Sequence, residues 1–75
     1  MISDRITIDP EIQHGKPVIR GTRVPITRIV GGIAGGMTKE EIIKEYAIEE
    51  LDIRAALAYA NELIEKEEFH AVPVG

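Results

Sequence analysis

Near the start of the chain, four residues follow the two-residue period of a β-strand. Arg5-Ile6-Thr7-Ile8 alternates polar and apolar residues, which predicts a short strand with Ile6 and Ile8 on one face. Residues 9–17 contain two prolines, a glycine and a histidine, a composition typical of a loop, and Val18-Ile19 is long enough to pair back on the first strand. We therefore predict a β-hairpin, which is marginal alone and must pack on helices or pair with a second copy.

From Pro25 onward the apolar period becomes that of an α-helix. Pro25 suits the first turn of a helix that ends near Gly36. Thr38 and Glu41 form a capping box, which predicts the start of a second, short helix. A third helix is predicted from about Glu50 to Lys66. Its apolar stripe consists of Ile53, Ala56, Leu57, Ala60 and Ile64, widened by Tyr59 and Leu63.

These elements predict one mainly α domain, a three-helix, helix-turn-helix-like bundle preceded by a short β-hairpin. Residues 1–24 form the hairpin and a Gly/Pro-rich basic corner, residues 25–66 form the bundle, and residues 67–75 form an extended tail. The tail carries Phe69, Val72 and Val74, which we expect to bind a protein partner. A chain of 75 residues has a small core, so we also expect a homodimer.

The charge of −4 is divided unevenly along the sequence. Residues 1–39 carry six Lys/Arg and three Asp/Glu, whereas residues 40–75 carry three Lys/Arg and ten Asp/Glu. The third helix opens with Glu49, Glu50 and Asp52, which would repel phosphates brought to its N-terminus. A local basic patch in the first half can still dock phosphates if the acidic half faces elsewhere.

The candidate nucleic-acid-binding residues are therefore concentrated in the basic corner, residues 15–26, and just after it. Arginine can hold a phosphate or a guanine edge with two hydrogen bonds. The predicted contacts are Lys16, Arg20, Thr22, Arg23, Arg28 and, on the third helix, Arg54. In the alternative interpretation, Arg20 or Arg23 pairs with Asp9, Glu11 or the acidic helices and only fixes the hairpin.

Other classes of site have little support in the sequence. His14 and His70 lack partners at metal-ligand spacing, the chain has no cysteine, and no nucleophile and base form a catalytic set. We therefore expect no enzymatic activity, cofactor, metal or small-molecule substrate. No apolar run approaches the length of a membrane span and the first residues do not resemble a signal peptide, so we expect no membrane association and a cytoplasmic location.

Three segments of the chain closely resemble the prokaryotic domain-of-unknown-function family 433. They are Gly15-Lys16-Pro17-Val18-Ile19-Arg20-Gly21-Thr22-Arg23-Val24-Pro25-Ile26, Gly36-Met37 before Glu40-Glu41-Ile42, and Asp52-Ile53-Arg54-Ala55-Ala56-Leu57-Ala58-Tyr59-Ala60. The resemblance implies a homeodomain-like helix-turn-helix fold and an antitoxin of a type II toxin–antitoxin pair, partnered with a PIN-like nuclease. The chain departs from the family pattern after Tyr46, where Ala47 and Glu49 replace the usual proline and the Ser/Thr helix cap.

The sequence thus leads to two functional hypotheses. The first is an antitoxin-like protein that binds a PIN-like nuclease toxin through its tail and its own operator DNA through the basic corner. The second is an oligomerisation or adaptor module that binds only protein. The salt dependence of DNA binding separates them, because phosphate contacts release counterions.

Overall fold

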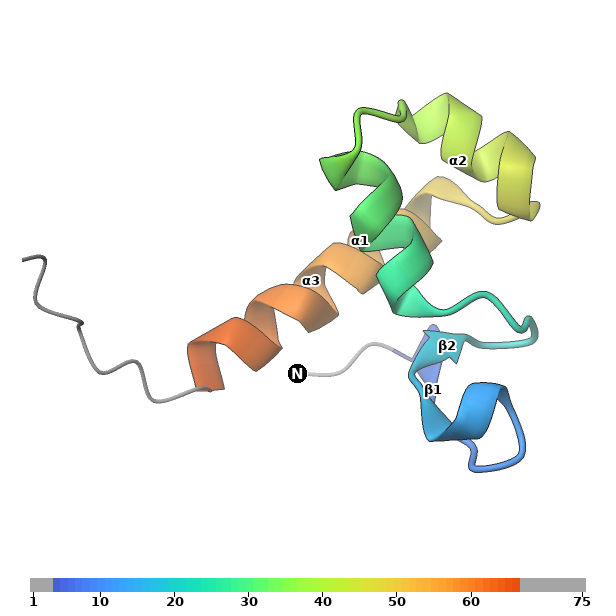
Figure 1. The fold of residues 1–75 in the computed structure, drawn as a ribbon, viewed down its shortest axis with the longest axis vertical. Helices are drawn as coiled ribbons and strands as arrows, with labels where there is room; N and C mark the ends of the chain where they lie inside the picture. Colours follow the sequence, from blue (N-terminus) through green and yellow to red (C-terminus); the bar gives the residue numbers. More distant parts are fainter. Residues whose placement is uncertain (1–3, 67–75) are drawn as a thin grey trace, which may run out of the picture.

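A computed structural model describes residues 4–66, which form a two-stranded hairpin and three α-helices (Figure 1). Strand β1 (Ile6–Thr7) pairs antiparallel with β2 (Val18–Ile19), with Ile6 opposite Ile19. A short 3-10 helix, η1 (Gln13–Gly15), lies between the strands. The helices are α1 (Ile26–Ala34), α2 (Lys39–Tyr46) and α3 (Glu50–Lys66). The predicted fold class is confirmed.

The starts and ends of the helices follow the local signals in the sequence. Pro25 is the N-cap residue of α1, and Gly36, with a φ of 99°, follows its C-terminal end. The capping box of α2 is complete: the Thr38 hydroxyl accepts the Glu41 N–H at 3.1 Å, and the Glu41 carboxylate accepts the Thr38 N–H at 2.8 Å. Two of the four orphan N–H groups of α2 are thereby satisfied.

The core is built mainly from isoleucine, and every strand and α-helix contributes to it. It consists of Ile6, Ile19, Ile26, Ile29, Ile42, Ile48, Ile53, Ala55, Ala56 and Tyr59. The hairpin therefore packs on the helices through Ile6 and Ile19, as its marginal stability alone requires. The predicted strand that includes Ile8 is too long: β1 ends at Thr7, so Ile8 lies beyond the strand and is exposed, whereas Ile6 is buried.

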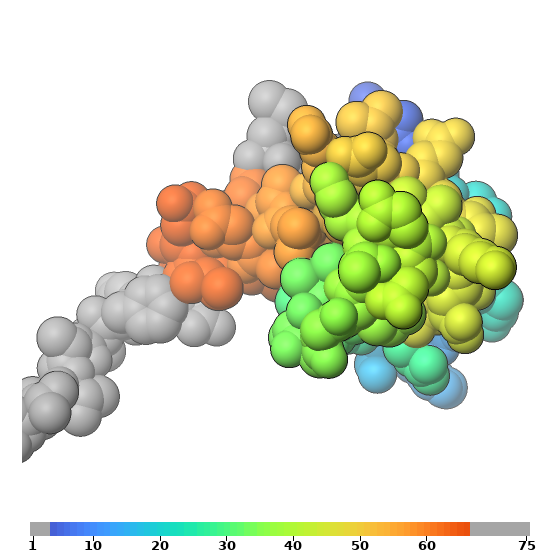
Figure 2. Space-filling model, turned by 90° about the horizontal axis from the view of Figure 1, so that it is seen from above, coloured from blue at the N-terminus to red at the C-terminus, as the bar shows by residue number. Residues whose placement is uncertain are grey.

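The predicted apolar stripe of α3 is only partly buried. Ile53, Ala56 and Tyr59 are in the core, but Leu57 and Ile64 are 40% and 54% exposed. Leu57 lies between the buried Ala56 and Tyr59, so its exposure reflects the face of α3 on which it lies. Ile64 is exposed because the nine residues of α1 span about 14 Å and cannot cover the 17 residues of α3, which span about 26 Å. The C-terminal half of α3 projects from the rest of residues 4–66 (Figures 1 and 2).

None of the helices in residues 4–66 combines the length and the apolarity needed to cross a membrane. The predicted partner-binding residues Phe69, Val72 and Val74 lie outside the described residues, as does His70.

Candidate nucleic-acid interface

The basic corner, residues 15–26, is a narrow loop whose two sides are hydrogen-bonded to each other. The Ile19 N–H donates to the Val24 carbonyl at 2.9 Å, and the Ile26 N–H donates to the Pro17 carbonyl at 2.9 Å. Val18 and Ile19 anchor the loop because both are almost fully buried. At the tip, from Arg20 to Arg23, both arginines are exposed.

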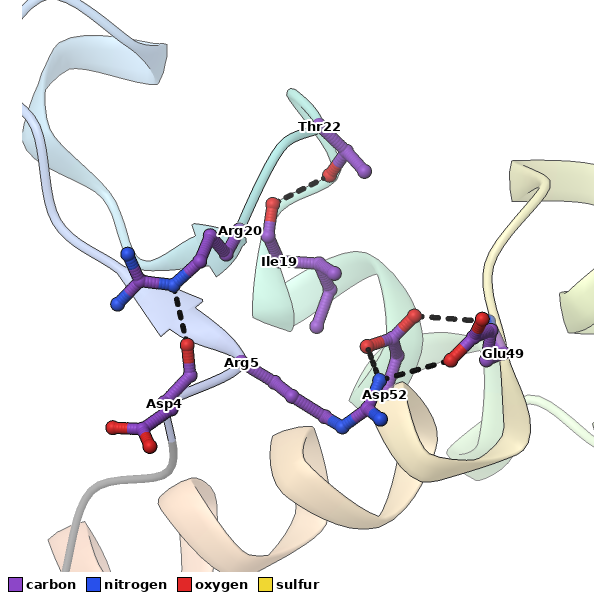
Figure 3. A network of polar contacts seen from close by, with 7 residues as sticks. All are labelled: Asp4, Arg5, Ile19, Arg20, Thr22, Glu49 and Asp52. Carbon is purple, nitrogen blue, oxygen red and sulfur yellow. Dashed lines mark hydrogen bonds and ion pairs between the residues drawn. The ribbon is translucent and has the colours of Figure 1, made fainter.

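Thr22 shapes this tip with its hydroxyl group. The Thr22 Oγ1 donates to the Ile19 carbonyl at 2.7 Å (Figure 3) and accepts the Val24 N–H at 3.0 Å. Gly21, immediately before it, has a φ of 79°, which favours glycine. Of the predicted nucleic-acid contacts, Thr22 is thus half-buried and already uses its hydroxyl within the loop.

Arg23 and Arg28 lie together on the wall of one shallow cavity of about 270 Å³. Tyr46, the last residue of α2, and Gln13 line the same cavity. The Gln13 amide Nε2 donates to the Arg23 carbonyl at 3.1 Å, which fixes the backbone that carries this arginine. Within residues 4–66 neither guanidinium forms an ion pair, so both charges remain available to an external anion.

Arg20 points to a different surface. Its Nε donates to the Asp4 carbonyl (Figure 3), and its side chain lines an open cavity of about 490 Å³ together with Asp4, Arg5, Glu49 and Asp52. The carboxylates in this cavity make it a mixed-charge surface and a poor site for a phosphate. Within the described part of the chain, Arg20 and Arg23 form no ion pair with Asp9, Glu11 or the acidic helices, although Arg20 holds the start of the hairpin through its bond to the Asp4 carbonyl.

The ion pair that fixes the hairpin is instead made by Arg5. Its Nη1 lies 3.0 Å from Glu49 Oε1 and 3.0 Å from Asp52 Oδ1 (Figure 3). The hydrogen bond to Asp52, followed by that to Glu49, raises the pKa of Arg5 above its ordinary value. The other oxygen of Asp52 accepts the Glu49 N–H at 2.9 Å, so this carboxylate both caps α3 and receives the hairpin arginine.

Sequence reasoning missed this cluster, although one local signal was present. Asp52 is the third residue of α3, the position from which an acidic side chain reaches back to the preceding N–H in a capping box. That signal predicts the bond to Glu49 but not the contact with Arg5, which is 47 residues away in the sequence.

The remaining predicted cations are also dispersed. The side chain of Arg54 is 72% exposed on α3, and its Nη2 lies 3.7 Å from Glu50 Oε2, which also accepts Lys39 Nζ at 3.2 Å. Lys16 lies at an apolar groove between α1 and α3. The structure therefore brings together Arg23 and Arg28 but does not gather all the predicted contacts on one patch.

The described residues offer no site for a metal ion. They contain no cluster of three or more histidine, cysteine, aspartate or glutamate side chains with suitable geometry. His14 is exposed within η1.

Residues 6–60 match the model of the DUF433 family, which is described as a protein of unknown function. The uncharacterized protein y4eO of Sinorhizobium fredii is 36% identical over 57 residues, which are 75% of this chain and 26% of that protein. This chain therefore spans about a quarter of the length of that curated relative.

Two solved structures resemble the fold described above. The crystal structure of a DUF433 member from Anabaena variabilis has a TM-score of 0.77 and 28% identity, over 88% of this chain and 66% of that one. The crystal structure of Rv2018 from Mycobacterium tuberculosis has a TM-score of 0.64 and 27% identity, over 69% of this chain and 24% of that one.

Proposed function

We propose that this chain, which belongs to the DUF433 family, is an antitoxin-like module that binds operator DNA through phosphate contacts of Arg23 and Arg28. One observation carries the DNA part of this proposal. Arg23 and Arg28 are exposed, line the same cavity and have no ion-pair partner among residues 4–66, so both guanidinium groups can bind an external anion.

The helix-turn-helix arrangement of α2 and α3 supports a nucleic-acid partner, but α3 is not expected to make the main contacts. Helices α2 and α3 are joined by a turn of three residues, 47–49, as in helix-turn-helix proteins. Glu49 and Glu50 stand at the start of α3, where such proteins usually contact bases, and their charges repel phosphates. We therefore assign the main phosphate contacts to the cavity beside α1.

Tyr46 extends the same proposal to a third group. Its phenolic hydroxyl can donate a hydrogen bond to a phosphate oxygen, and its ring lines the cavity that Arg23 and Arg28 share. Because Tyr46 ends α2, a phosphate held here lies against the helix-turn-helix unit as well as the basic corner. This arrangement fixes position on a duplex without base recognition.

The salt dependence of DNA binding tests the proposal. A duplex from the region upstream of this protein's own gene is titrated at several salt concentrations with the parent and with the Arg23→Ala/Arg28→Ala variant. The binding constant K falls as salt rises, and each lost phosphate contact reduces the steepness of log K against log salt by about 0.9. For the double variant we therefore expect the plot to be shallower by about 2 slope units, and the affinity at low salt to be at least tenfold lower.

A charge-matched control excludes a general effect of net charge. Lys44→Ala/Lys66→Ala removes two exposed cations from α2 and α3 and leaves the cavity intact. This variant is expected to keep a slope close to that of the parent. Equal slopes for the two double variants would contradict a phosphate site at Arg23 and Arg28, and absence of binding at low salt would favour the protein-only adaptor.

The second half of the proposal is a PIN-like nuclease partner that binds residues 67–75 through Phe69, Val72 and Val74. Apolar residues in a short segment are a common means of occupying a groove on a partner. The test is co-purification with a PIN-like nuclease, which we expect to be encoded beside this protein's own gene. Capture is expected with the full chain and not with residues 1–66. Equal capture by the shortened chain would remove the tail from the interface.

A further inference from the structure

From Leu57 onward, α3 exposes an apolar surface beside an apolar groove. We call the exposed side chains of Leu57 and Ile64 the α3 ridge; with Ala60 between them, they follow the spacing of one helix face. The α1–α3 groove is a cavity of about 290 Å³ next to this ridge. Its walls include Pro17, Ile26, Val30, Tyr59 and Leu63, with Lys16 at the margin.

We propose that the α3 ridge of one chain docks in the α1–α3 groove of a second copy of this chain, forming an antiparallel, two-fold symmetric dimer. A two-fold contact requires a self-complementary surface, in which each chain supplies both the inserted and the receiving element. This face meets that requirement, since ridge and groove are adjacent and Ala60 belongs to both. This inference does not depend on the proposed DNA or nuclease binding.

The charges around the two surfaces favour a second copy as the occupant. Lys16 lies at the groove and Glu65 is exposed on the projecting end of α3, and neither forms an ion pair within residues 4–66. In the dimer, Glu65 of each chain pairs with Lys16 of the other, twice by symmetry. The same interface covers the part of α3 that the short α1 leaves exposed.

The small size of the domain also favours dimerisation. Leu57, Leu63 and Ile64 are 40%, 50% and 54% exposed, so three of the largest apolar side chains of α3 remain partly in water in the single chain. A chain of this size buries a smaller fraction of its surface than larger domains do. Removing these side chains from water in a dimer adds the apolar burial that one copy cannot supply.

The oligomeric mass tests the docking surface. Sedimentation equilibrium of the full chain is expected to give a concentration-dependent mass that rises to twice the 8.3 kDa of one chain. Leu57→Glu/Ile64→Glu is expected to raise the dissociation constant at least about tenfold, because carboxylates cannot enter an apolar groove unpaired. Circular dichroism establishes that this variant is folded. A monomeric parent, or a folded variant that dimerises like the parent, would overturn the proposal.

The matched control replaces apolar residues of similar exposure elsewhere. Ile8 and Leu51 are 56% and 52% exposed and lie outside the ridge and the groove. Ile8→Glu/Leu51→Glu is expected to keep the dissociation constant of the parent. An equal loss of dimer in this control would show that any added charge disrupts association, and it would overturn the assignment to α3.

A charge exchange identifies the second copy as the occupant. Lys16→Glu and Glu65→Lys each place like charges at both symmetric contacts of their own homodimers, whereas the mixed dimer pairs opposite charges at both. We expect the two variants to associate more tightly with each other than either does with itself, at low salt. Equal association in all combinations would overturn the Lys16–Glu65 contact and with it the antiparallel arrangement.

Discussion

At the scale of single residues, Gly31 and Gly36 near the C-terminal end of α1 differ in backbone conformation: Gly31 is helical, whereas Gly36 is left-handed. Gly31 lies within the helix, and a Cβ atom added there meets nothing within 4 Å. Gly36 has a φ of 99°, which strains any residue with a side chain. We expect Gly31→Ala to raise the free energy of unfolding by about 0.5–1 kcal/mol and Gly36→Ala to lower it by about 1–2 kcal/mol, as measured by urea denaturation.

Each variant serves as the other's control, because both add one methyl group in open space. Effects of the same sign would show that the difference in backbone conformation is not what determines stability here. Neither substitution lies in the cavity of Arg23 and Arg28 or in the α1–α3 groove, so DNA binding and dimerisation are expected to be unchanged.

Residue-level predictions from the sequence succeeded where the partners are close in the chain. The Thr38–Glu41 capping box was predictable because both hydrogen bonds join residues three apart. The contact between Arg5 and Asp52 was not, because nothing local to a strand arginine identifies a carboxylate 47 residues away. The cavity shared by Arg23, Arg28 and Tyr46 depends in the same way on how α2 packs on α1.

At the scale of elements, the turn between α2 and α3 depends on one strained residue. Ala47 follows α2 with a φ of 55°, and its N–H donates to the Ile43 carbonyl as the C-cap bond. A left-handed conformation costs an L-residue about 1–2 kcal/mol, which glycine avoids. We expect Ala47→Gly to raise the free energy of unfolding by about 0.5–1 kcal/mol, since the greater chain entropy of glycine offsets part of the gain.

Chemical denaturation of Ala47→Gly beside Ala58→Gly provides the measurement. Ala58 is exposed in the middle of α3, where glycine is expected to cost about 1 kcal/mol. If both variants were destabilised to the same extent, Ala47 would not be strained in solution.

The boundaries of the helices were predictable from the sequence, whereas the residues of each helix that are buried by its neighbours were not. The limits of α3, Glu50 and Lys66, follow from the apolar stripe and its flanking charges. Which residues of that stripe are buried depends on the face of α3 that packs against α1, which decides the exposure of Leu57, and on the length of α1, which decides that of Ile64. Leu57 and Ile64 therefore look like core residues in the sequence but lie at the surface of the single chain.

At the scale of the whole molecule, Asp52 joins the two ends of the fold. Its carboxylate accepts hydrogen bonds from Arg5 of the hairpin and from the backbone N–H of Glu49 before α3. Together with the burial of Ile6 and Ile19, this contact attaches the hairpin to the helices. Loss of the carboxylate affects both the helix cap and the attachment of the hairpin.

The comparison of Asp52→Ala with Glu49→Ala tests this role. Both substitutions remove one carboxylate that lies 3.0 Å from Arg5, but the Asp52 side chain is 10% exposed and that of Glu49 is 74% exposed. We expect Asp52→Ala to lower the free energy of unfolding by about 1–3 kcal/mol and Glu49→Ala by no more than about 0.5 kcal/mol. Equal losses would show that the cluster acts only through charge.

The pH dependence follows from the direction of the Arg5 shift. The neighbouring carboxylates raise the pKa of Arg5, so its stabilising contribution is complete below the pKa of the unfolded chain and is lost only as the pH rises through the raised value. The difference in unfolding free energy between the parent and Asp52→Ala is therefore expected to stay constant from neutral to mildly alkaline pH. A difference that shrinks over this range in urea denaturation would mean that Arg5 is not the group that Asp52 holds.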